Sequence, residues 1–497
     1  MKKGIRIGFL FLLFTSSAFS QQVKKKFPNI IYIYADDMGY GELGCYGQQK
    51  IKTPNLDRMA AEGIKFLQHY SSAPVCAPSR AMLLTGKHAG HSYIRGNYEL
   101  GGFADSAERG QMPLPAEAFT VADLLKRHGY KTALVGKWGL GMGNNEGSPL
   151  KHGFDYYYGY LDQKQAHNFY PTHLWENDKR VALNQPYIDV HKKSDSATAT
   201  DADFEYYKGK EYAPAKMTEK ALAFIDSNRN QPFFLYLPYT LPHVSLQATD
   251  EYVKKYIGLF DEKPYYGQRG YASTKFPRST YAAMVTYLDD QVGIIMQKIK
   301  EAGLDENTII MFSSDNGASK EGGADANYFN TVNGLRGLKR ELYEGGIRIP
   351  FIARWPGTIP AGTTSNLISS QYDLLATIAV ISNEKIKNTD GISFLNELKG
   401  KNRRQQKHPY LYFEFAEYGG QVAIRMGNWK AIKTNLKENP NAPWELYNLV
   451  TDRNETTDVA AQYPELIKKF NAILKKEHQP SHVKEWDFID NKVSADK

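Results

Sequence analysis

The sequence predicts an α/β fold: a large, mostly parallel sheet sandwiched by helices, with a smaller C-terminal α+β subdomain that carries an antiparallel sheet. Short apolar runs recur through most of the 497 residues, and helix start and stop signals lie between them. This alternation of strand and helix is typical of a parallel sheet with helices on both faces. Near residue 385 the pattern changes to closely spaced strands, which indicates a second unit.

Five apolar runs are the expected strands of the large sheet. They are short and continuous, as expected for parallel strands that are buried on both faces. The runs cover residues 29–35, 131–135, 233–237, 308–312 and 349–354.

The expected helices lie between these runs. Thr53-Pro54 and Thr120 are typical of helix starts, and Gly63, Gly129 and Gly303 are typical of helix ends. The helices are expected over residues 55–62, 81–85, 121–128, 217–228 and 281–302.

A basic, polar connector over residues 401–407 separates the C-terminal segment from the rest. Beyond it we expect three antiparallel strands and a terminal helix, at residues 410–415, 421–426, 428–434 and 463–475. The division of the chain is therefore expected to be a signal peptide at 1–20, the main α/β domain at 24–400 and the C-terminal α+β subdomain at 401–497.

The N-terminus has the pattern of a signal peptide. Lys2, Lys3 and Arg6 precede an apolar run over 7–14, and Ala18-Phe19-Ser20 offers small residues for cleavage after Ser20. The run is too short to remain as a transmembrane anchor. We expect transport by the export machinery and a periplasmic or secreted protein; an uncleaved helix at the membrane surface is the alternative.

Charge and cysteine content exclude some classes of function. The net charge of +8 is spread along the chain, and no nucleic-acid-binding motif is present. The two cysteines, Cys45 and Cys76, are too few for a thiolate-rich metal site. A disulfide between them is the less favoured reading, because Cys76 lies in a motif with another use.

Two of the expected strands end in acidic residues. Asp36 and Asp37 follow the strand 29–35, and Asp315 and Asn316 follow the strand 308–312. Ligands of open α/β sheets bind at the carboxyl ends of the strands. Carboxylate and amide oxygens favour one hard cation, Ca²⁺ with Mg²⁺ as the alternative. Asp and Asn also form turns and helix caps at strand ends, which is the competing interpretation.

A short motif, Cys76-Ala77-Pro78-Ser79-Arg80, precedes the helix expected at 81–85. Free N–H groups and the positive end of the helix dipole favour an oxyanion at such a position. Arg80 adds a fixed cation, and we expect the same field to lower the pKa of the Cys76 thiol. The pattern indicates a nucleophile.

With this motif, which Leu84-Thr85-Gly86 continues, the chain resembles the type I sulfatases of the alkaline phosphatase superfamily. The resemblance implies that a maturation enzyme oxidises Cys76 to formylglycine, whose hydrate attacks the sulfur of a sulfate ester. It also implies that the converted Cys76 and the two acidic pairs hold the cation. A hemiacetal sulfate can collapse to the aldehyde, whereas a serine sulfate would be hard to hydrolyse.

Three further segments are similar to catalytic segments of that family. Lys137 lies in Gly136-Lys137-Trp138, His243 follows Pro242, and Lys339 follows Gly337-Leu338. The resemblance implies that both lysines contact the sulfate and that His243 protonates the leaving oxygen. Catalytic roles are thus expected for Cys76, Arg80, Lys137, His243 and Lys339. Residues 444–449 (WELYNL) resemble the family's C-terminal signature.

The chain departs from the family at Gly139. Many members carry a histidine there, which is thought to deprotonate the second hydroxyl of the hydrate. His88 or His91 is our hypothesis for a replacement base.

The expected substrate is a sulfated saccharide, because export, aromatic content and the resemblance all favour one. Candidate substrate-binding residues are Arg95, Asn97, His167, Arg336 and Glu414. Two alternatives stay open: a phosphatase or phosphodiesterase of the same superfamily, and an inactive relative that only binds glycans. The Cys76 motif argues against the first, and the intact set of catalytic candidates argues against the second.

Overall fold

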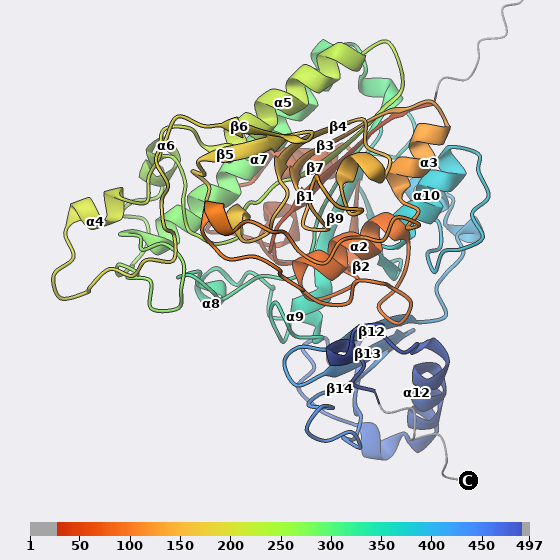
Figure 1. Cartoon of the computed structure of the whole chain (residues 1–497). Coiled ribbons are helices and arrows are strands. Elements are labelled where there is room, and N and C mark those ends of the chain that lie inside the picture. Colours follow the sequence, from red (N-terminus) through yellow and green to blue (C-terminus); the bar gives the residue numbers. More distant parts are fainter. Residues whose placement is uncertain (1–26, 490–497) are drawn as a thin grey trace, which may run out of the picture.

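An eleven-stranded sheet forms the centre of the protein, in the order β10-β2-β9-β8-β1-β7-β3-β4-β5-β6 with β11 paired to β2. The computed structural model describes residues 27–489. The signal peptide expected at 1–20 lies outside the described residues. Figure 1 shows the sheet between layers of helices, with the C-terminal unit below it.

The centre of the sheet is parallel. β1 (Asn29–Ala35) pairs in parallel with β7 (Phe233–Pro238) and with β8 (Thr308–Ser314). β3 (Lys131–Lys137) pairs in parallel with β7 on the other side. β9 (Arg348–Arg354) is antiparallel to β8. The predicted fold class, a mostly parallel sheet covered by helices, is confirmed.

Several strands on either side of the central ones were not expected from the sequence. The run Ile64–Tyr70 (β2) contains lysine, glutamine and histidine, and three of its seven residues are only partly buried, so it lacks the continuous apolar signal of the central strands. The strands missed in the sequence analysis are β2 (Ile64–Tyr70), β4 (Tyr156–Tyr160), β5 (His173–Glu176), β6 (Lys179–Ala182), β10 (Thr363–Ser365) and β11 (Ser369–Ser370).

Alternate side chains of each central strand point into two separate cores. In β1, Ile31 and Ile33 face the core that contains α1, α5 and α7, whereas Ile30 and Tyr32 face the core that contains α2, α3, α10 and α11. The helices of the first core are α1 (Pro54–Ala61), α5 (Ala213–Asn228) and α7 (Pro277–Glu301). Those of the second are α2 (Cys76–Thr85), α3 (Val121–Arg127), α10 (Asp373–Ile381) and α11 (Leu395–Leu398).

Three helices begin earlier than the sequence indicated. α5 and α7 each begin one turn before the expected start, with a proline in the first turn, where its missing N–H does no harm. α2 begins at Cys76 itself, so the motif forms the first turns of the helix. The remaining short helices are α4 (Asp201–Glu205), α6 (Asp250–Lys254), α8 (Ala326–Phe329) and α9 (Glu344–Ile347).

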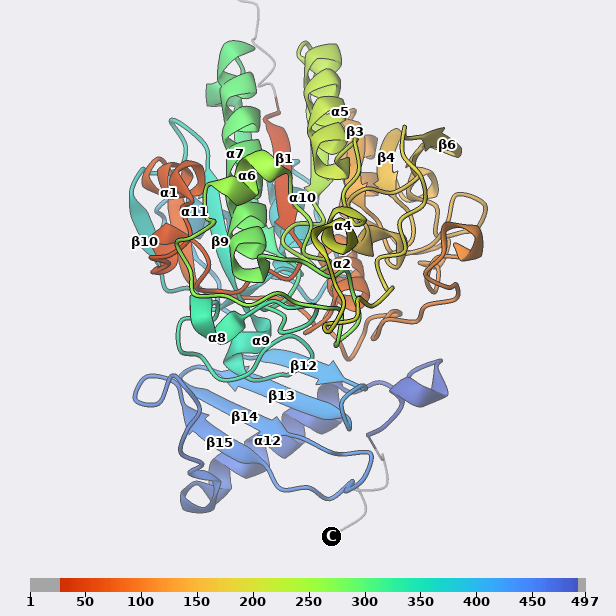
Figure 2. The same cartoon turned by 90° about the vertical axis from the view of Figure 1, so that its left-hand side faces the viewer.

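The C-terminal unit is a four-stranded antiparallel sheet with one long helix beside it (Figure 2). Its strands are β12 (Leu411–Phe415), β13 (Gln421–Met426), β14 (Trp429–Lys433) and β15 (Glu445–Asn448), and the helix is α12 (Pro464–Glu477). β15 was not expected. It lies within the segment that resembles the family's C-terminal signature.

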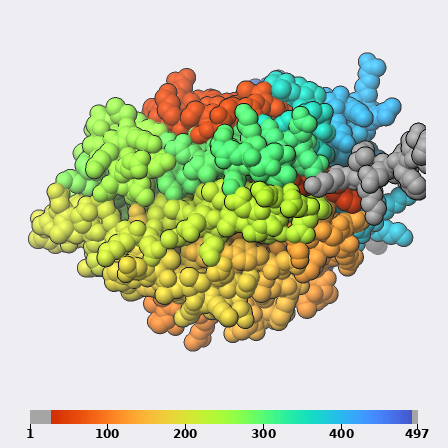
Figure 3. Space-filling model, turned by 90° about the horizontal axis from the view of Figure 1, so that it is seen from above, coloured from red at the N-terminus to blue at the C-terminus, as the bar shows by residue number. Residues whose placement is uncertain are grey.

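Segments distant in the sequence share the upper surface of the molecule. In the view from above, the green middle of the chain lies between red atoms from its beginning and orange and yellow atoms from the segments that precede α5 (Figure 3). None of the helices within residues 27–489 has the length and apolar character needed to cross a bilayer.

Candidate active site

The two acidic pairs meet because their strands are neighbours. β1 and β8 pair in parallel with Ala35 opposite Ser314, so the residues that follow each strand emerge side by side. The backbone N–H of Asp37 donates to Oδ1 of Asp315 at 3.0 Å. Asp37 has a φ of 66°, a left-handed conformation that aspartate tolerates better than most residues. All four acidic and amide side chains are buried.

Each carboxylate of the cluster contacts a buried cation. Lys137 Nζ lies 2.7 Å from Oδ2 of Asp36. Lys339 Nζ lies 2.8 Å from Oδ2 of Asp37, and Arg80 Nη2 lies 2.8 Å from Oδ2 of Asp315. Three carboxylates are therefore balanced by three cations that come from three different elements of the chain.

The cations and carboxylates shift one another's pKa values. Burial opposes ionisation of Asp36, but Lys137 and His243 together hold the pKa of that carboxyl well below its usual range. Burial and the neighbouring Asp36 raise the pKa of Asp315 to about 7. Such opposed shifts are typical of functional sites that hold a further charge.

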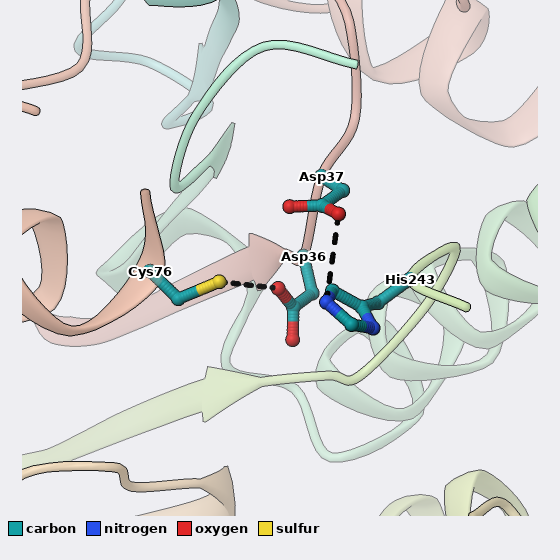
Figure 4. Close-up of side chains that lie close together, drawn as sticks. All are labelled: Asp36, Asp37, Cys76 and His243. Atoms are coloured by element: carbon teal, nitrogen blue, oxygen red, sulfur yellow. Dashed lines mark hydrogen bonds and ion pairs between the residues drawn. The ribbon is translucent and has the colours of Figure 1, made fainter. Parts of the chain in front are cut away.

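Cys76 is the first residue of α2 and points at the acidic cluster (Figure 4). Its Sγ lies 3.4 Å from Oδ1 of Asp36. Burial raises the pKa of the Cys76 thiol well above its ordinary value, and this outweighs the attraction of Lys137 and Lys339. The expected lowering of this pKa by the helix N-terminus is therefore wrong. A buried, protonated thiol is a poor nucleophile.

Polar contacts fix the position of α2, the helix that carries Cys76. Ser79 Oγ donates to the backbone carbonyl of Asp315, and Gln371 Nε2 donates to the Ser79 carbonyl at 3.1 Å. Arg80 Nη1 donates to the carbonyl of Lys137 at 3.0 Å. The nucleophile position is thereby fixed relative to the strand ends β8 and β3.

His243 lies on the opposite side of the cluster from Cys76 (Figure 4). Its Nε2 is 3.1 Å from Lys339 Nζ and 3.6 Å from Oδ2 of Asp37, and its Nδ1 contacts the carbonyl of Val244. Burial and Lys339 lower the pKa of His243. The ring of His167 stacks on it with centroids 5.2 Å apart.

The residues present fit a hard divalent cation. Ligand atoms of Asp36, Asp37, Cys76 and His243 all lie within 4.8 Å of one another. Oδ1 of Asn316 is buried and has no hydrogen-bond partner among the described residues. A buried amide oxygen beside carboxylates is the donor that Ca²⁺ or Mg²⁺ accepts. The ends of β1 and β8 thus both offer oxygen atoms that could hold a cation.

The five candidate substrate residues separate into two groups. Asn97 accepts a hydrogen bond from the backbone N–H of Ala77 at 3.0 Å, and His167 stacks on His243, so both lie next to the cluster. Arg95 and Glu414 instead form a buried ion pair with each other at 2.6 Å. Arg336 bonds to Tyr447 and lies over Tyr343. Arg95, Glu414 and Arg336 therefore contact side chains that lie outside the acidic cluster.

His88 and His91 follow the other end of α2. His88 Nε2 lies 3.0 Å from Oε2 of Glu477, and His91 Nδ1 lies 2.9 Å from Oδ1 of Asp390. The N–H of Gly90 donates to His88 Nδ1, which leaves the proton of a neutral ring on Nε2, facing Glu477. The ion-pair partners of both histidines are thus carboxylates at the end of α2 opposite to Cys76.

Two buried glutamines, Gln371 and Gln163, were not among the residues predicted from the sequence. Gln371 follows the two-residue strand β11 and accepts a hydrogen bond from Tyr34 while it holds Ser79. Gln163 follows the unrecognised strand β4. The aromatic run 156–160 (YYYGY) is a strand signal that could have drawn attention to the residues after it.

Comparison with known proteins places this fold in a family. A model of the sulfatase family matches residues 28–382, and a model of the C-terminal region of N-sulphoglucosamine sulphohydrolases matches residues 337–480. The chain belongs to the sulfatase family, whose members are sulfuric ester hydrolases.

Several relatives align along most of their length. An N-acetylgalactosamine-6-O-sulfatase of Bacteroides thetaiotaomicron is 30% identical, over 90% of this chain and 92% of the relative. An N-acetylgalactosamine-6-sulfatase of Mus musculus is 33% identical over 81% and 71%. A steryl-sulfatase of Homo sapiens is 30% identical over 88% and 81%. These relatives share a reaction class and differ in the substrates that they are named for.

A solved structure, Ps i-CgsB in complex with k-i-k-neocarrahexaose, has the same fold. It superposes with a TM-score of 0.73 at 28% identity and covers 94% of this chain and 96% of its own. The similarity therefore extends over both the large sheet and the C-terminal unit.

Proposed function

We propose that this enzyme hydrolyses a sulfate ester on a saccharide, with a formylglycine formed from Cys76 as its nucleophile and one divalent cation at the acidic cluster. The observation that carries the proposal is the position of Cys76. Its Sγ lies 3.4 Å from Asp36, at the start of α2, and faces carboxylates that three buried cations balance.

The raised pKa of the Cys76 thiol supports conversion to another nucleophile. A maturation enzyme, which supplies the oxidant, would convert the thiol to an aldehyde that hydrates to a diol. Attack of one hydroxyl on sulfur forms a hemiacetal sulfate and releases the sugar alcohol. Loss of the proton of the second hydroxyl then expels sulfate and restores the aldehyde.

The residues around Cys76 can stabilise the charges of this reaction. Arg80 and Lys137 contact the side of the cluster near the nucleophile, and Lys339 contacts the side near His243. Fixed cations in a water-poor site stabilise charge that develops on sulfate oxygens and on the leaving oxygen. His243, next to Lys339, is placed to hand a proton to that leaving oxygen.

The charge balance of the cluster supports a bound dication. Without a dication, the charges of the three carboxylates and the three cations cancel, and the site has no net charge that would attract an anion. A dication held by Asp36, Asp37, Asp315 and Asn316 would leave a net charge of about +2 for a sulfate ester. Its chemistry would be that of a Lewis acid at an oxygen ligand. We propose Ca²⁺, with Mg²⁺ as the alternative.

The names of the relatives support a saccharide substrate. Two are named for N-acetylgalactosamine 6-sulfate, and the structural neighbour was solved with a neocarrahexaose. Next to the cluster, Asn97 and His167 are our candidates for contact with the sugar. We also propose export by the signal peptide at 1–20 and the division into domains at 24–400 and 401–497.

The test is the peptide mass at Cys76 together with anion release. Protein produced with a competent maturation enzyme is expected to lose about 18 Da at the Cys76 peptide, the difference between thiol and aldehyde. It is then expected to release sulfate from a panel of sulfated sugars. Cys76→Ala should abolish both results, whereas the matched Cys45→Ala should retain both, because Cys45 is a free cysteine outside the cluster.

Two outcomes would contradict the proposal. An unmodified thiol together with glycan retention and no anion release would favour a binding protein. Release of phosphate in preference to sulfate would favour a phosphatase of the same superfamily.

A further inference from the structure

Gln163 is a buried glutamine whose side-chain amide has no partner. It is 2% exposed, and both Oε1 and Nε2 lack a hydrogen bond among the described residues. Its backbone is well anchored, since its N–H donates to Oε1 of Gln111 at 3.3 Å. Buried amide groups are nearly always bonded, because an unpaired donor or acceptor keeps its full desolvation penalty. An unpaired pair of amide atoms therefore points to a ligand.

The Gln163 side chain occupies the space in front of Gly139. A Cβ at Gly139 would lie 2.9 Å from Cγ of Gln163 and 3.1 Å from its Cδ, closer than ordinary contact. The φ of Gly139 is +75°, which also disfavours a side chain there. Many sulfatases carry a histidine at this position. In this chain, Gln163 fills the volume in which that side chain would begin.

The strand order places Gln163 at the active-site edge of the sheet. β3 ends at Lys137, β4 ends at Tyr160, and the two strands are paired in parallel. The pairing continues beyond their ends, because Gly139 N–H donates to the carbonyl of Leu161 at 3.1 Å. Gln163 thus stands beside the residues that follow Lys137, whose ammonium contacts Asp36.

A second unpaired polar atom lies after the next strand of this edge. β7 lies on the other side of β3, and Oγ1 of Thr240, two residues beyond β7, is buried with no hydrogen-bond partner within residues 27–489. Thr240 is also three residues before His243, a catalytic candidate. The segments that follow β7 and β4, on either side of β3, therefore both carry unused hydrogen-bonding groups, which a site for a polar ligand requires.

We propose that Gln163 is a further catalytic residue that takes the place of the family's histidine. This inference rests on the proposed sulfatase function. Its Nε2 donates to an oxygen of the sulfate, and its Oε1 accepts a hydrogen bond from the diol hydroxyl that does not attack. A carboxamide holds these groups in place and takes up no proton. Gln163 therefore orients the second hydroxyl, and the proton of that hydroxyl passes to a water molecule as sulfate is expelled.

The test uses substitutions that keep the shape of the side chain. Gln163→Met removes both amide atoms at nearly constant volume, and Gln163→Leu is a second variant in case the first folds poorly. We expect kcat to fall about 100-fold, the usual loss for one donor to a transition-state oxygen, with a smaller change in KM. The melting temperature should stay level or rise, because unpaired buried polar atoms are removed.

A matched control separates catalysis from packing. Gln247 is also a buried glutamine, but its Nε2 donates to the Tyr207 carbonyl at 2.6 Å and its Oε1 accepts from Phe169 N–H at 2.9 Å. Gln247→Met is expected to lower the melting temperature and to leave kcat within about twofold, because it breaks satisfied hydrogen bonds away from the cluster.

The possible failures can be told apart. The wild type must show the loss of about 18 Da at Cys76 and release sulfate; if it does neither, the proposed function fails and this inference falls with it. The Gln163 variants must show the same mass loss, so that maturation is intact. Full kcat in a matured Gln163→Met or Gln163→Leu enzyme would overturn the role of Gln163 and leave the sulfatase function standing.

Discussion

Nδ2 of Asn316 lies 2.7 Å from Oδ1 of Asp37, and this contact determines which way the Asn316 amide faces. The second neighbour of Nδ2, the carbonyl of Gly317 at 2.9 Å, is also an acceptor. Only the NH₂ group can satisfy both, so Oδ1 must point the other way, where it has no partner among the described residues. The cluster thus presents one neutral oxygen beside its carboxylates.

This orientation predicts the effect of removing the cation. Chelation is expected to lower both the melting temperature and the rate of sulfate release, because a cation that binds only the folded state stabilises it. Asn316→Ala should weaken cation binding about 10- to 100-fold, by analogy with the loss of metal-site groups. Elemental analysis after dialysis and titration of the apo-protein by calorimetry would measure both. Unchanged cation content in Asn316→Ala would contradict this assignment.

Lys137 provides a test of electrostatic stabilisation. It is 1% exposed at the end of β3 and contacts Asp36 at 2.7 Å. Lys137→Met should lower kcat about 10²- to 10³-fold, as expected for loss of one fixed donor. Lys131 is exposed at the start of the same strand, and Lys131→Met should leave kcat unchanged. Equal kinetics for the two variants in a sulfate-release assay would exclude Lys137 from the reaction.

The acidic cluster could be predicted from the sequence because its signal is local. Asp36 and Asp37 directly follow one apolar strand, and Asp315 and Asn316 follow another, so strand adjacency brings them together. His243 and Lys339 lie in loops with no such pattern, and only the resemblance to sulfatases indicated them. Their contact at 3.1 Å depends on the three-dimensional path of both loops.

Other features could not be predicted because they depend on burial. The sequence suggests a low pKa for the Cys76 thiol from the helix N-terminus, but complete burial reverses the direction of the shift. Arg95 and Glu414, candidates for sugar binding, satisfy each other in a buried ion pair that links distant segments. Gln163 was overlooked because β4, the strand before it, was not recognised.

A buried lysine of the C-terminal sheet is ion-paired with two glutamates, one of which lies in α9 of the main domain. Lys430 on β14 lies 3.1 Å from Oε1 of Glu344 and 2.9 Å from Oε1 of Glu455, and all three side chains are fully buried. Removing the lysine leaves Glu455 without a cation and leaves Glu344 with Arg348, whose Nη1 lies 3.2 Å from Oε2 of Glu344. Lys430→Met is therefore expected to lower the free energy of unfolding by about 3–5 kcal/mol, measured by urea denaturation.

Two further variants test this explanation. Lys437→Met replaces an exposed lysine beyond β14 and should change the free energy of unfolding by less than about 0.5 kcal/mol. Adding Glu455→Gln to Lys430→Met removes one uncompensated charge and should restore part of the lost stability. A double variant that is as unstable as the sum of the two single variants would show that the three groups do not act as a unit.

Glu477, at the end of α12, predicts a pH dependence of stability. The hydrogen bond from His88, together with those from Lys476 and Tyr410, holds the pKa of the Glu477 carboxyl well below its usual range. The folded protein therefore binds fewer protons at this group than the unfolded chain, whose glutamates have a pKa of about 4.3. The stabilisation is complete above about pH 5 and is lost as the pH falls through 4.3 toward the lower pKa of the folded state.

We therefore expect the free energy of unfolding to decrease as the pH falls below about 5, and we expect Glu477→Gln to flatten part of that decrease. The variant should be less stable at pH 7 by about 1–3 kcal/mol, because it loses charged hydrogen bonds at a residue that is only 7% exposed. Glu465→Gln, at an exposed position in the first turn of the same helix, is the matched control and should follow the wild-type curve. The contact between His88 and Glu477 joins the segment after α2 to the end of α12. If the free energy of unfolding of Glu477→Gln and of the wild type changed with pH in parallel, this contact would contribute nothing to the acid sensitivity of the fold.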